Sequence, residues 1–381
     1  MQCVIVKNMK IILSKADLTT AISKVQSVVA LRPVAPILGT ILMEAKEDEL
    51  ILTATDLMVS IRVFIGAKVL EEGGITIPAR KFFQLIRELT APQIEIHSMG
   101  PDVVFINAGA SHFKIPGMLP SEFPPFPDLS TGLILNLSGA SLKSTLMRTQ
   151  FAAAREDARI YLNGVCMELE GEHLTCIGSD GKRLAKVHIA APLPAKHKSI
   201  SLIPIKAVEE MLRLLPNETV ELTLMPDKLA LRTPSSLLMT KLLSGKFPDY
   251  SRFIPQTKGE GIALHREELQ ILLRQIILFT SDEDGAARFL FSAGELSMEV
   301  EHGELGAGKV KMAANYTGEK LEIAFNIRYF LEALAHSTDE IVYLHITHPF
   351  EPGLLTDSTT AQFVLMPMRI TAPAVATPNI A

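Results

Sequence analysis

Residues 13–25, LSKADLTTAISKV, have two counterparts in this 381-residue chain: LSGASLKSTLMRT at 137–149 and LHREELQILLRQI at 264–276. The three segments align without gaps. Matching positions are four and then three residues apart, at Leu18, Ile22 and Val25; Leu142, Leu146 and Thr149; and Leu269, Leu273 and Ile276. This i, i+4, i+7 spacing predicts one buried face of an amphipathic helix. The copies start about 125 residues apart, the size of a domain, so the chain is predicted to be three copies of one unit.

A second helix is predicted in each copy. Residues 78–86 (PARKFFQLI), 204–212 (PIKAVEEML) and 326–334 (NIRYFLEAL) begin with Pro or Asn, which favour a helix start. The apolar positions again coincide, at Phe82, Val208 and Phe330, and at Ile86, Leu212 and Leu334. The third residue is basic each time: Arg80, Lys206 and Arg328.

Strand-like segments lie between and after these helices. Residues 37–56, 161–180 and 287–302 each predict two strands joined by a polar turn, and residues 94–116, 220–243 and 342–369 predict a closing hairpin in each copy. The order predicts an α+β fold with segregated antiparallel sheets, not a parallel βαβ sheet. We expect domains at 1–128, 129–256 and 257–370, with linkers near 124–132 and 255–261 and a disordered tail at 371–381.

Residues 363–370, FVLMPMRI, alternate as a strand does, with Val364, Met366, Met368 and Ile370 on one face. Pro367 has no N–H to donate, which favours either a strand at the edge of a sheet or the end of a strand. Two methionines beside such an edge form an apolar surface that adapts to different guests. An ordinary edge strand with core methionines is the alternative interpretation.

Composition excludes several classes. No window approaches eighteen apolar residues, so no transmembrane helix is expected, and three cysteines without metal spacing (Cys3, Cys166, Cys176) indicate reduced thiols in a cytoplasmic protein. Met9 is a second plausible start. The net charge is −5, yet the six helical segments together are net positive. This indicates either a shared basic helical surface or merely a few surplus Lys and Arg residues on solvated helix faces. The chain contains no GxxxxGK[ST], GxSxG or HExxH motif, and neither the His345/His348 pair nor SDED at 281–284 has metal-ligand spacing. We expect neither catalysis nor a cofactor or metal.

These features together resemble the bacterial sliding clamp family, the beta subunit of DNA polymerase III. The resemblance spans residues 9–370 and lies in RPVAPILG (32–39), ATDL (54–57), IPARKFF (77–83), YLNG (161–164), SDGKRLA (179–185), KFPDYSR (246–252) and VLMPMRI (364–370). It implies a non-catalytic processivity factor: a head-to-tail homodimer that closes a ring around duplex DNA, with helices inside and sheets outside. Implied partners are the polymerase III catalytic subunit, the clamp loader and other proteins with clamp-binding motifs.

The resemblance also implies site residues. The peptide cleft matches Leu162, Ser179, Gly181, Lys182, Arg183, Leu184, Pro248, Arg252, Phe253, Val364, Met366, Pro367, Met368 and Arg369. DNA contacts match Arg32, Arg80, Gln150, Tyr161 and Lys206, and the dimer interface matches Phe113, Ile115, Leu278 and Phe279. Lys182, Phe253 and Ile160 depart from the family pattern, so the preferred peptide motif and one DNA contact are open.

Two other function classes remain as alternatives to a sliding clamp. An enzyme with an unrecognised acid–base site is one, and a triplicated peptide-binding scaffold that never meets DNA is the other. Topology distinguishes the scaffold from a clamp, because only a ring is retained on circular DNA and lost when the circle is cut.

Overall fold

Two compact units make up the computed structural model, which describes residues 8–30, 32–100, 102–191, 198–257, 259–281 and 285–369. Unit 1 comprises Met1–Ser144, Ala191–His197 and Ser201–Leu243, and unit 2 comprises Thr145–Ala190, Lys198–Ile200 and Ser244–Ala381. The middle copy is therefore shared between the two units. The predicted boundaries at 128 and 256 stay predictions. Cys3, Ile370, the tail 371–381 and most of the SDED run lie outside the described residues.

All six predicted helices are present. The first helix of each copy is α1 (Lys15–Gln26), α3 (Gly139–Gln150) or α5 (Arg266–Ile276), and the second is α2 (Ala79–Glu88), α4 (Ile205–Leu214) or α6 (Ile327–Ala335). The predicted faces of α1, α3 and α5 are buried at every position. In α4 the core position belongs to Met211, while Leu212 is half-buried.

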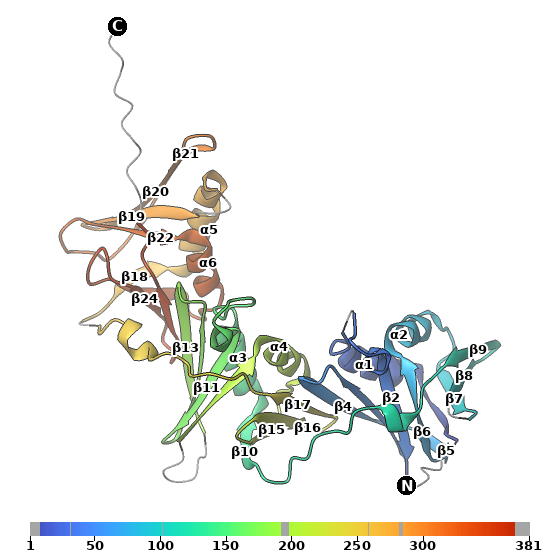
Figure 1. Ribbon diagram of the computed structural model, residues 1–381. Coiled ribbons are helices and arrows are strands. Elements are labelled where there is room, and N and C mark those ends of the chain that lie inside the picture. Colours follow the sequence, from blue (N-terminus) through green and yellow to red (C-terminus); the bar gives the residue numbers. More distant parts are fainter. Residues whose placement is uncertain are drawn as a thin grey trace. The chain divides into compact units, whose positions relative to one another are not determined.

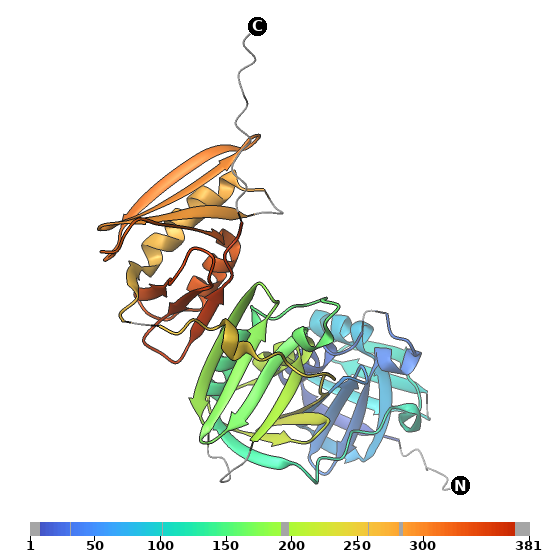
Figure 2. The ribbon, with the colours of Figure 1, turned by 60° about the vertical axis from the view of Figure 1, so that its left-hand side comes forward.

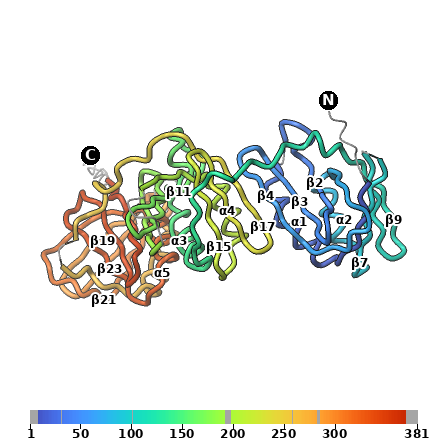
Figure 3. Tube along the Cα trace, turned by 90° about the horizontal axis from the view of Figure 1, so that it is seen from below, coloured from blue at the N-terminus to red at the C-terminus, as the bar shows by residue number. Residues whose placement is uncertain are grey.

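Unit 1 contains two sheets, and Figure 3 shows α1 and α2 lying side by side next to their strands. The first sheet has the order β5 (Lys68–Glu71), β1 (Lys10–Ser14), β7 (Gln93–Ser98), β8 (Val103–Ala108) and β9 (Ser111–Pro116). The second has the order β10 (Leu133–Ser138), β15 (Thr219–Leu224), β16 (Lys228–Thr233), β17 (Ser236–Lys241), β4 (Val59–Gly66), β3 (Glu49–Thr55), β2 (Thr40–Lys46) and β6 (Gly73–Pro78).

Unit 2 also contains two sheets, and helices α5 and α6 lie beside each other in it (Figure 1). The larger sheet has the order β14 (Lys198–Pro204), β11 (Gly164–Glu170), β12 (His173–Ser179), β13 (Arg183–Ala190), β25 (Gln362–Leu365), β24 (Gly353–Thr356), β23 (Ile341–His345) and β18 (Ile262–His265). The smaller has the order β21 (Gly306–Ala313), β20 (Glu295–His302), β19 (Ala286–Ser292) and β22 (Leu321–Asn326), and its orange strands cover the tan helix α5 in Figure 2.

Each large sheet contains strands from two neighbouring copies. Strand β4 of the first copy pairs antiparallel with β17 of the second, and β13 of the second pairs antiparallel with β25 of the third. The copies are thus joined through backbone hydrogen bonds as well as through the linkers. This is the physical reason why the compact units do not follow the three copies.

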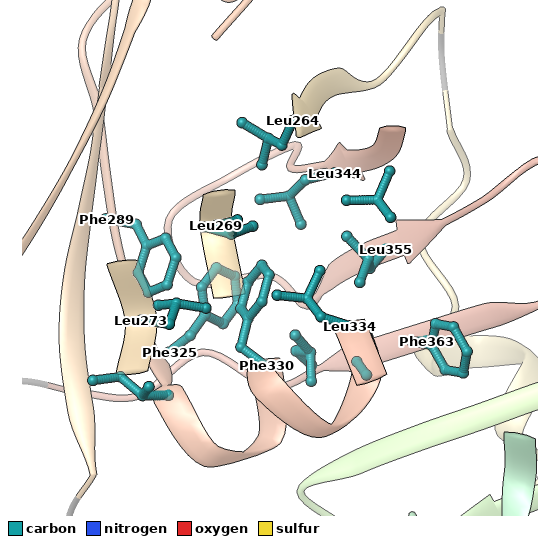
Figure 4. Close-up of a cluster of buried hydrophobic side chains, with 14 of the residues drawn as sticks. Leu264, Leu269, Leu273, Phe289, Phe325, Phe330, Leu334, Leu344, Leu355 and Phe363 are labelled. Atoms are coloured by element: carbon teal, nitrogen blue, oxygen red, sulfur yellow. The ribbon is translucent and has the colours of Figure 1, made fainter. Parts of the chain in front are cut away.

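The core of the third copy is built from aromatic and leucine side chains on α5, α6 and the strands that they cover (Figure 4). The rings of Phe289 and Phe330 stack with centroids 5.2 Å apart, and Phe325 meets both edge-on. Leu269, from the repeated helix face, belongs to the same cluster. The repeated i, i+4, i+7 pattern therefore marks the core, as predicted.

The prediction of one continuous strand over 363–370 is wrong, and so is its position at a sheet edge, because β25 lies between β13 and β24. Pro367 follows the end of the strand instead. Strand β25 ends at Leu365. The Met366 N–H still donates to the Lys182 carbonyl (3.1 Å), in register with the Arg183–Leu365 pair, but the Met368 N–H donates to the Ala324 carbonyl instead (2.8 Å). Pro367 between them has no N–H. Met366 and Met368 therefore do not share a strand face.

A buried ion pair fastens α3 to the third copy. The Arg148 guanidinium donates to the Asp357 carboxylate, to the Thr359 hydroxyl (2.7 Å) and to the His336 carbonyl (2.8 Å). The Asp357 side chain is fully buried and Arg148 nearly so. Removing one partner would leave the other charge buried without compensation.

We therefore expect Arg148→Ala to lower the free energy of unfolding by about 3–5 kcal/mol. The matched control is Arg288→Ala, because the Arg288 guanidinium is one-third exposed and 4.0 Å from the Glu322 carboxylate; we expect a loss below about 1 kcal/mol there. Urea unfolding followed by circular dichroism measures both. Equal losses in the two variants would contradict a special role for the buried pair.

Candidate functional site

A largely apolar cavity of about 190 Å³ lies in unit 2, at the junction of strands β13 and β25. Side chains from four segments line it: the short 3-10 helix at Ile160–Leu162, the turn between β12 and β13, the segment 247–253, and the end of β25. The lining residues are Arg159, Tyr161, Leu162, Ser179, Gly181, Arg183, Leu184, Phe247, Pro248, Tyr250, Phe253, Val364 and Met366. We call this cavity the cleft.

The turn between β12 and β13 forms one side of the cleft, and local hydrogen bonds fix it. The Ser179 hydroxyl accepts from the Gly181 N–H (3.1 Å) and donates to the Arg183 carbonyl (2.7 Å). The Asp180 carboxylate accepts from the Lys182 and Arg183 N–H groups at 2.9 and 3.0 Å. Gly181 has a φ of +84°, a conformation that side-chain-bearing residues rarely adopt. The SDGKR sequence therefore specifies this turn.

Aromatic residues form the opposite wall. The Tyr250 hydroxyl donates to the Glu168 carboxylate (2.6 Å), and burial together with this bond raises the pKa of Tyr250 well above its usual range. The Lys186 ammonium lies 5.6 Å from the centre of the Tyr250 ring. Tyr250 is thus held in place, while Phe253 at the end of the same short helix (Tyr250–Phe253) is 49% exposed. This wall can present an aromatic face to a ligand.

Arg159 lies at the polar rim. Its guanidinium donates to both oxygens of the Asp157 carboxylate at 2.9 Å. These hydrogen bonds, from the Arg159 side chain first and its backbone second, lower the pKa of Asp157 to about 2. The carboxylate therefore remains ionised, and Arg159 remains oriented, at any physiological pH.

Nine of the fourteen predicted cleft residues line the cavity: Leu162, Ser179, Gly181, Arg183, Leu184, Pro248, Phe253, Val364 and Met366. Five do not: Lys182, Arg252, Pro367, Met368 and Arg369. Met368 and Arg369 line a different cavity, because the chain leaves the β13 ladder after Met366. The other four lining residues are Arg159, Phe247 and Tyr250, which sequence reasoning missed, and Tyr161, which it assigned to DNA contact. The KFPDYSR motif contains two of these, and its aromatic spacing was the available signal.

The five residues predicted to contact DNA lie in different settings. Arg32 and Arg80 are exposed in unit 1. Lys206 is engaged, since its ammonium donates to the Asp56 carboxylate (2.6 Å) and to the Val28 carbonyl (3.1 Å). In unit 2, Gln150 is half-buried with its carbonyl oxygen unpaired among the described residues, and Tyr161 lines the cleft. The two exposed arginines are therefore the ones available to a phosphate.

The described part of the chain shows no group of three or more His, Cys, Asp or Glu side chains arranged to hold a metal ion. Cys166 and Cys176 are free and buried, and burial raises the pKa of both thiols. No described helix has the length and apolar character that crossing a membrane requires. The cleft is concave and largely apolar, as binding sites for small ligands and short peptides usually are.

Three repeated copies, each with two helices and antiparallel strands, and an apolar cleft where the second and third copies join define a protein of the DNA-clamp class. Models of the DNA polymerase III beta subunit match it along the chain: the N-terminal domain at residues 9–127, the central domain at 136–249 and the C-terminal domain at 251–369. The chain belongs to the DNA polymerase III beta subunit family, the beta sliding clamps. Members of this family are processivity factors and not catalytic subunits.

Individual relatives agree with this assignment. The beta sliding clamp of Chlamydia muridarum is 45% identical over 95% of this chain and 99% of its own length, and that of Chlamydia pneumoniae is 43% identical over 95% and 99%. Among solved structures, the sliding clamp of Pseudomonas aeruginosa bound to griselimycin has a TM-score of 0.91 at 27% identity, over 95% of this chain and 100% of that one.

Proposed function

We propose that this chain forms a head-to-tail homodimeric ring that encircles duplex DNA in the cytoplasm and tethers partner proteins through the cleft. The partners would be the polymerase III catalytic subunit, the clamp loader and other proteins with clamp-binding motifs. The observation that carries the proposal is the cleft, which has an apolar interior, a polar rim at Arg159, and adaptable Met366 at one wall. Short peptides with a Gln and one or two large apolar residues suit such a site.

The proposed ring contact uses the outer ends of the two small sheets. Strand β9 is the last strand of its sheet in unit 1, and β21 is the last strand of its sheet in unit 2. Edge strands have unpaired backbone groups on one side, which favours pairing with another chain. Phe113 on β9 is 37% exposed, and Leu278 beyond α5 is 75% exposed. Ile115 is buried within its own sheet, so it would pack beneath the contacting residues rather than touch the partner subunit.

Duplex DNA is the proposed occupant of the ring. Phosphate contacts by exposed arginines are independent of sequence and weaken as salt rises, because binding releases counterions. Arg32 and Arg80 have the exposure that such contacts need, whereas Lys206 would first have to leave Asp56.

The double variant Arg32→Glu, Arg80→Glu should reduce retention on DNA by about tenfold at low salt, with a smaller ratio at higher salt. The double variant Lys46→Glu, Lys68→Glu is the matched control, because both lysines are exposed on strands of the same unit and the two substitutions make the same charge change. Gel-shift measurements at several salt concentrations record both. A variant as well retained as the control would contradict the proposed DNA contacts, and a strong preference for one DNA sequence would contradict phosphate recognition.

The clamp itself is tested by topology. The protein, loaded onto nicked circular DNA by a clamp loader, should co-elute with the circle in gel filtration and separate from it after a restriction enzyme cuts the DNA. Continued co-elution with linear DNA would instead indicate ordinary binding. Failure to load, with normal peptide binding, would favour the scaffold that never meets DNA.

A further inference from the structure

The chain builds the junction between neighbouring copies twice, with the same backbone bonds. At the first junction, in unit 1, the N–H of Lys241 donates to the Met58 carbonyl (2.9 Å) where β17 meets β4. At the second, in unit 2, the N–H of Met366 donates to the Lys182 carbonyl (3.1 Å) where β25 meets β13. The side chains at the first junction can therefore be compared, position by position, with those at the second, which contains the cleft.

The surrounding turns are repeated as well. Asp56 accepts from the N–H groups two and three residues later at 2.9 and 2.7 Å, as Asp180 does at the second junction. A cation lies over an aromatic ring at both junctions: Arg62 over Phe126 (4.4 Å) and Lys186 over Tyr250 (5.6 Å). The aspartate turn and the cation–ring contact occur at both junctions, so they do not account for the cleft at the second.

The difference lies at the position three residues after each aspartate. It is Val59 at the first junction, fully buried, and Arg183 at the second. The second carboxylate oxygen of Asp56 accepts from the Lys206 ammonium on helix α4 (2.6 Å). The second carboxylate oxygen of Asp180 instead accepts from the guanidinium of Arg183 itself (3.1 Å). At the junction that has the cleft, an arginine thus takes the position that a buried valine occupies at the other junction.

Arg183 is held from several sides. Besides Asp180, its guanidinium donates to the Phe151 carbonyl (2.8 Å) and to the Glu332 carboxylate on α6. It also lies over the rings of Tyr329 (4.5 Å) and Phe151 (5.4 Å). The Arg183 side chain is only 10% exposed, so it forms part of the cleft wall rather than a free cation at its mouth.

We propose that Glu332 is a positioning residue for partner binding, although it does not line the cleft. Its carboxylate holds the Arg183 guanidinium against the Tyr329 and Phe151 rings and so keeps that charge out of the apolar interior. Without it, the guanidinium loses one charged partner and gains freedom to turn into the cleft, where it opposes apolar ligand groups. The inference rests on the proposed peptide binding.

The test measures fluorescence anisotropy of a labelled peptide with the full-length protein. The peptide is fluorescein-QASLF, which has the Gln and two large apolar residues that the proposed ligand requires. Glu332→Gln should weaken binding five- to twentyfold, and Glu332→Asp, which keeps the charge, should stay within about threefold of the original protein. The control is Glu322→Gln, whose side chain is 57% exposed on β22 compared with 50% for Glu332, and it should bind within twofold. Thermal melting confirms that each variant is folded.

A double-mutant cycle shows whether Glu332 acts through Arg183. In an Arg183→Met background, which removes the charge and itself weakens binding, Glu332→Gln should change the affinity by less than twofold. An effect of equal size in both backgrounds would overturn the proposal, as would wild-type affinity in Glu332→Gln itself. If the unmodified protein does not bind the peptide, the proposed peptide-binding function fails instead, and the two failures are distinguishable.

Discussion

Leu278→Glu should convert the proposed dimer to a monomer at low micromolar concentration. Leu278 lies in the short helix at Ile277–Phe279 that follows α5, and three-quarters of its surface is exposed within one chain. The neighbouring Phe279 ring packs beside Gly308 of edge strand β21, which places Leu278 next to the proposed contact. Burying a leucine contributes about 2 kcal/mol, and a buried unpaired carboxylate costs more.

A two-subunit ring contains the contact twice, so the effect is doubled. Light scattering or analytical ultracentrifugation gives the mass directly. Phe350→Glu is the matched control, because Phe350 is 78% exposed in unit 2 and lies in the segment between β23 and β24; it should remain dimeric. A fully dimeric Leu278→Glu protein would mean that the interface lies elsewhere.

Met366→Ala should weaken binding of the labelled QASLF peptide by about thirtyfold, or about 2 kcal/mol, as is usual for an apolar anchor in a binding cleft. Met366 lines the cleft, and its backbone bond to the Lys182 carbonyl survives the substitution. The effect should therefore come from the lost side chain and not from a broken ladder.

Met368→Ala is the natural control. Met368 is two residues away in the same predicted motif, yet it lines another cavity, and its N–H bonds to the Ala324 carbonyl. It should bind peptide within about twofold of the unmodified protein. Similar losses in both variants would show that the cleft extends beyond the cavity seen here. No loss in Met366→Ala would restore the interpretation of the methionines as ordinary core residues.

Much of the fold was predictable because each copy repeats one local pattern. Leu18, Leu142 and Leu269 occupy one helical position, and all three are fully buried. The apolar spacing depends only on neighbours within eight residues, which sequence displays directly. The two-strand segments at 37–56, 161–180 and 287–302 were predictable for the same reason, and each forms an antiparallel pair.

The end of β25 was not predictable from the alternation of FVLMPMRI. The bond that diverts Met368 reaches Ala324, a residue more than forty positions earlier, and no local pattern contains that partner. Tyr250 was missed as a cleft residue because its orientation depends on Glu168, 82 residues away. Arg183 lines the cavity, and the contacts that hold it come from Phe151, Tyr329 and Glu332, which only the fold brings together.

The sheets that run from one copy into the next determine how this chain bears mechanical load. Along β4–β17 and β13–β25 the backbone bonds lie side by side between antiparallel strands, so a pull along the strands loads them together in shear. The predicted linkers at 124–132 and 255–261 would then carry little tension while the ladders are intact. Any partner pulling on the cleft would transmit its force through β13 and β25 themselves, from one copy to the next.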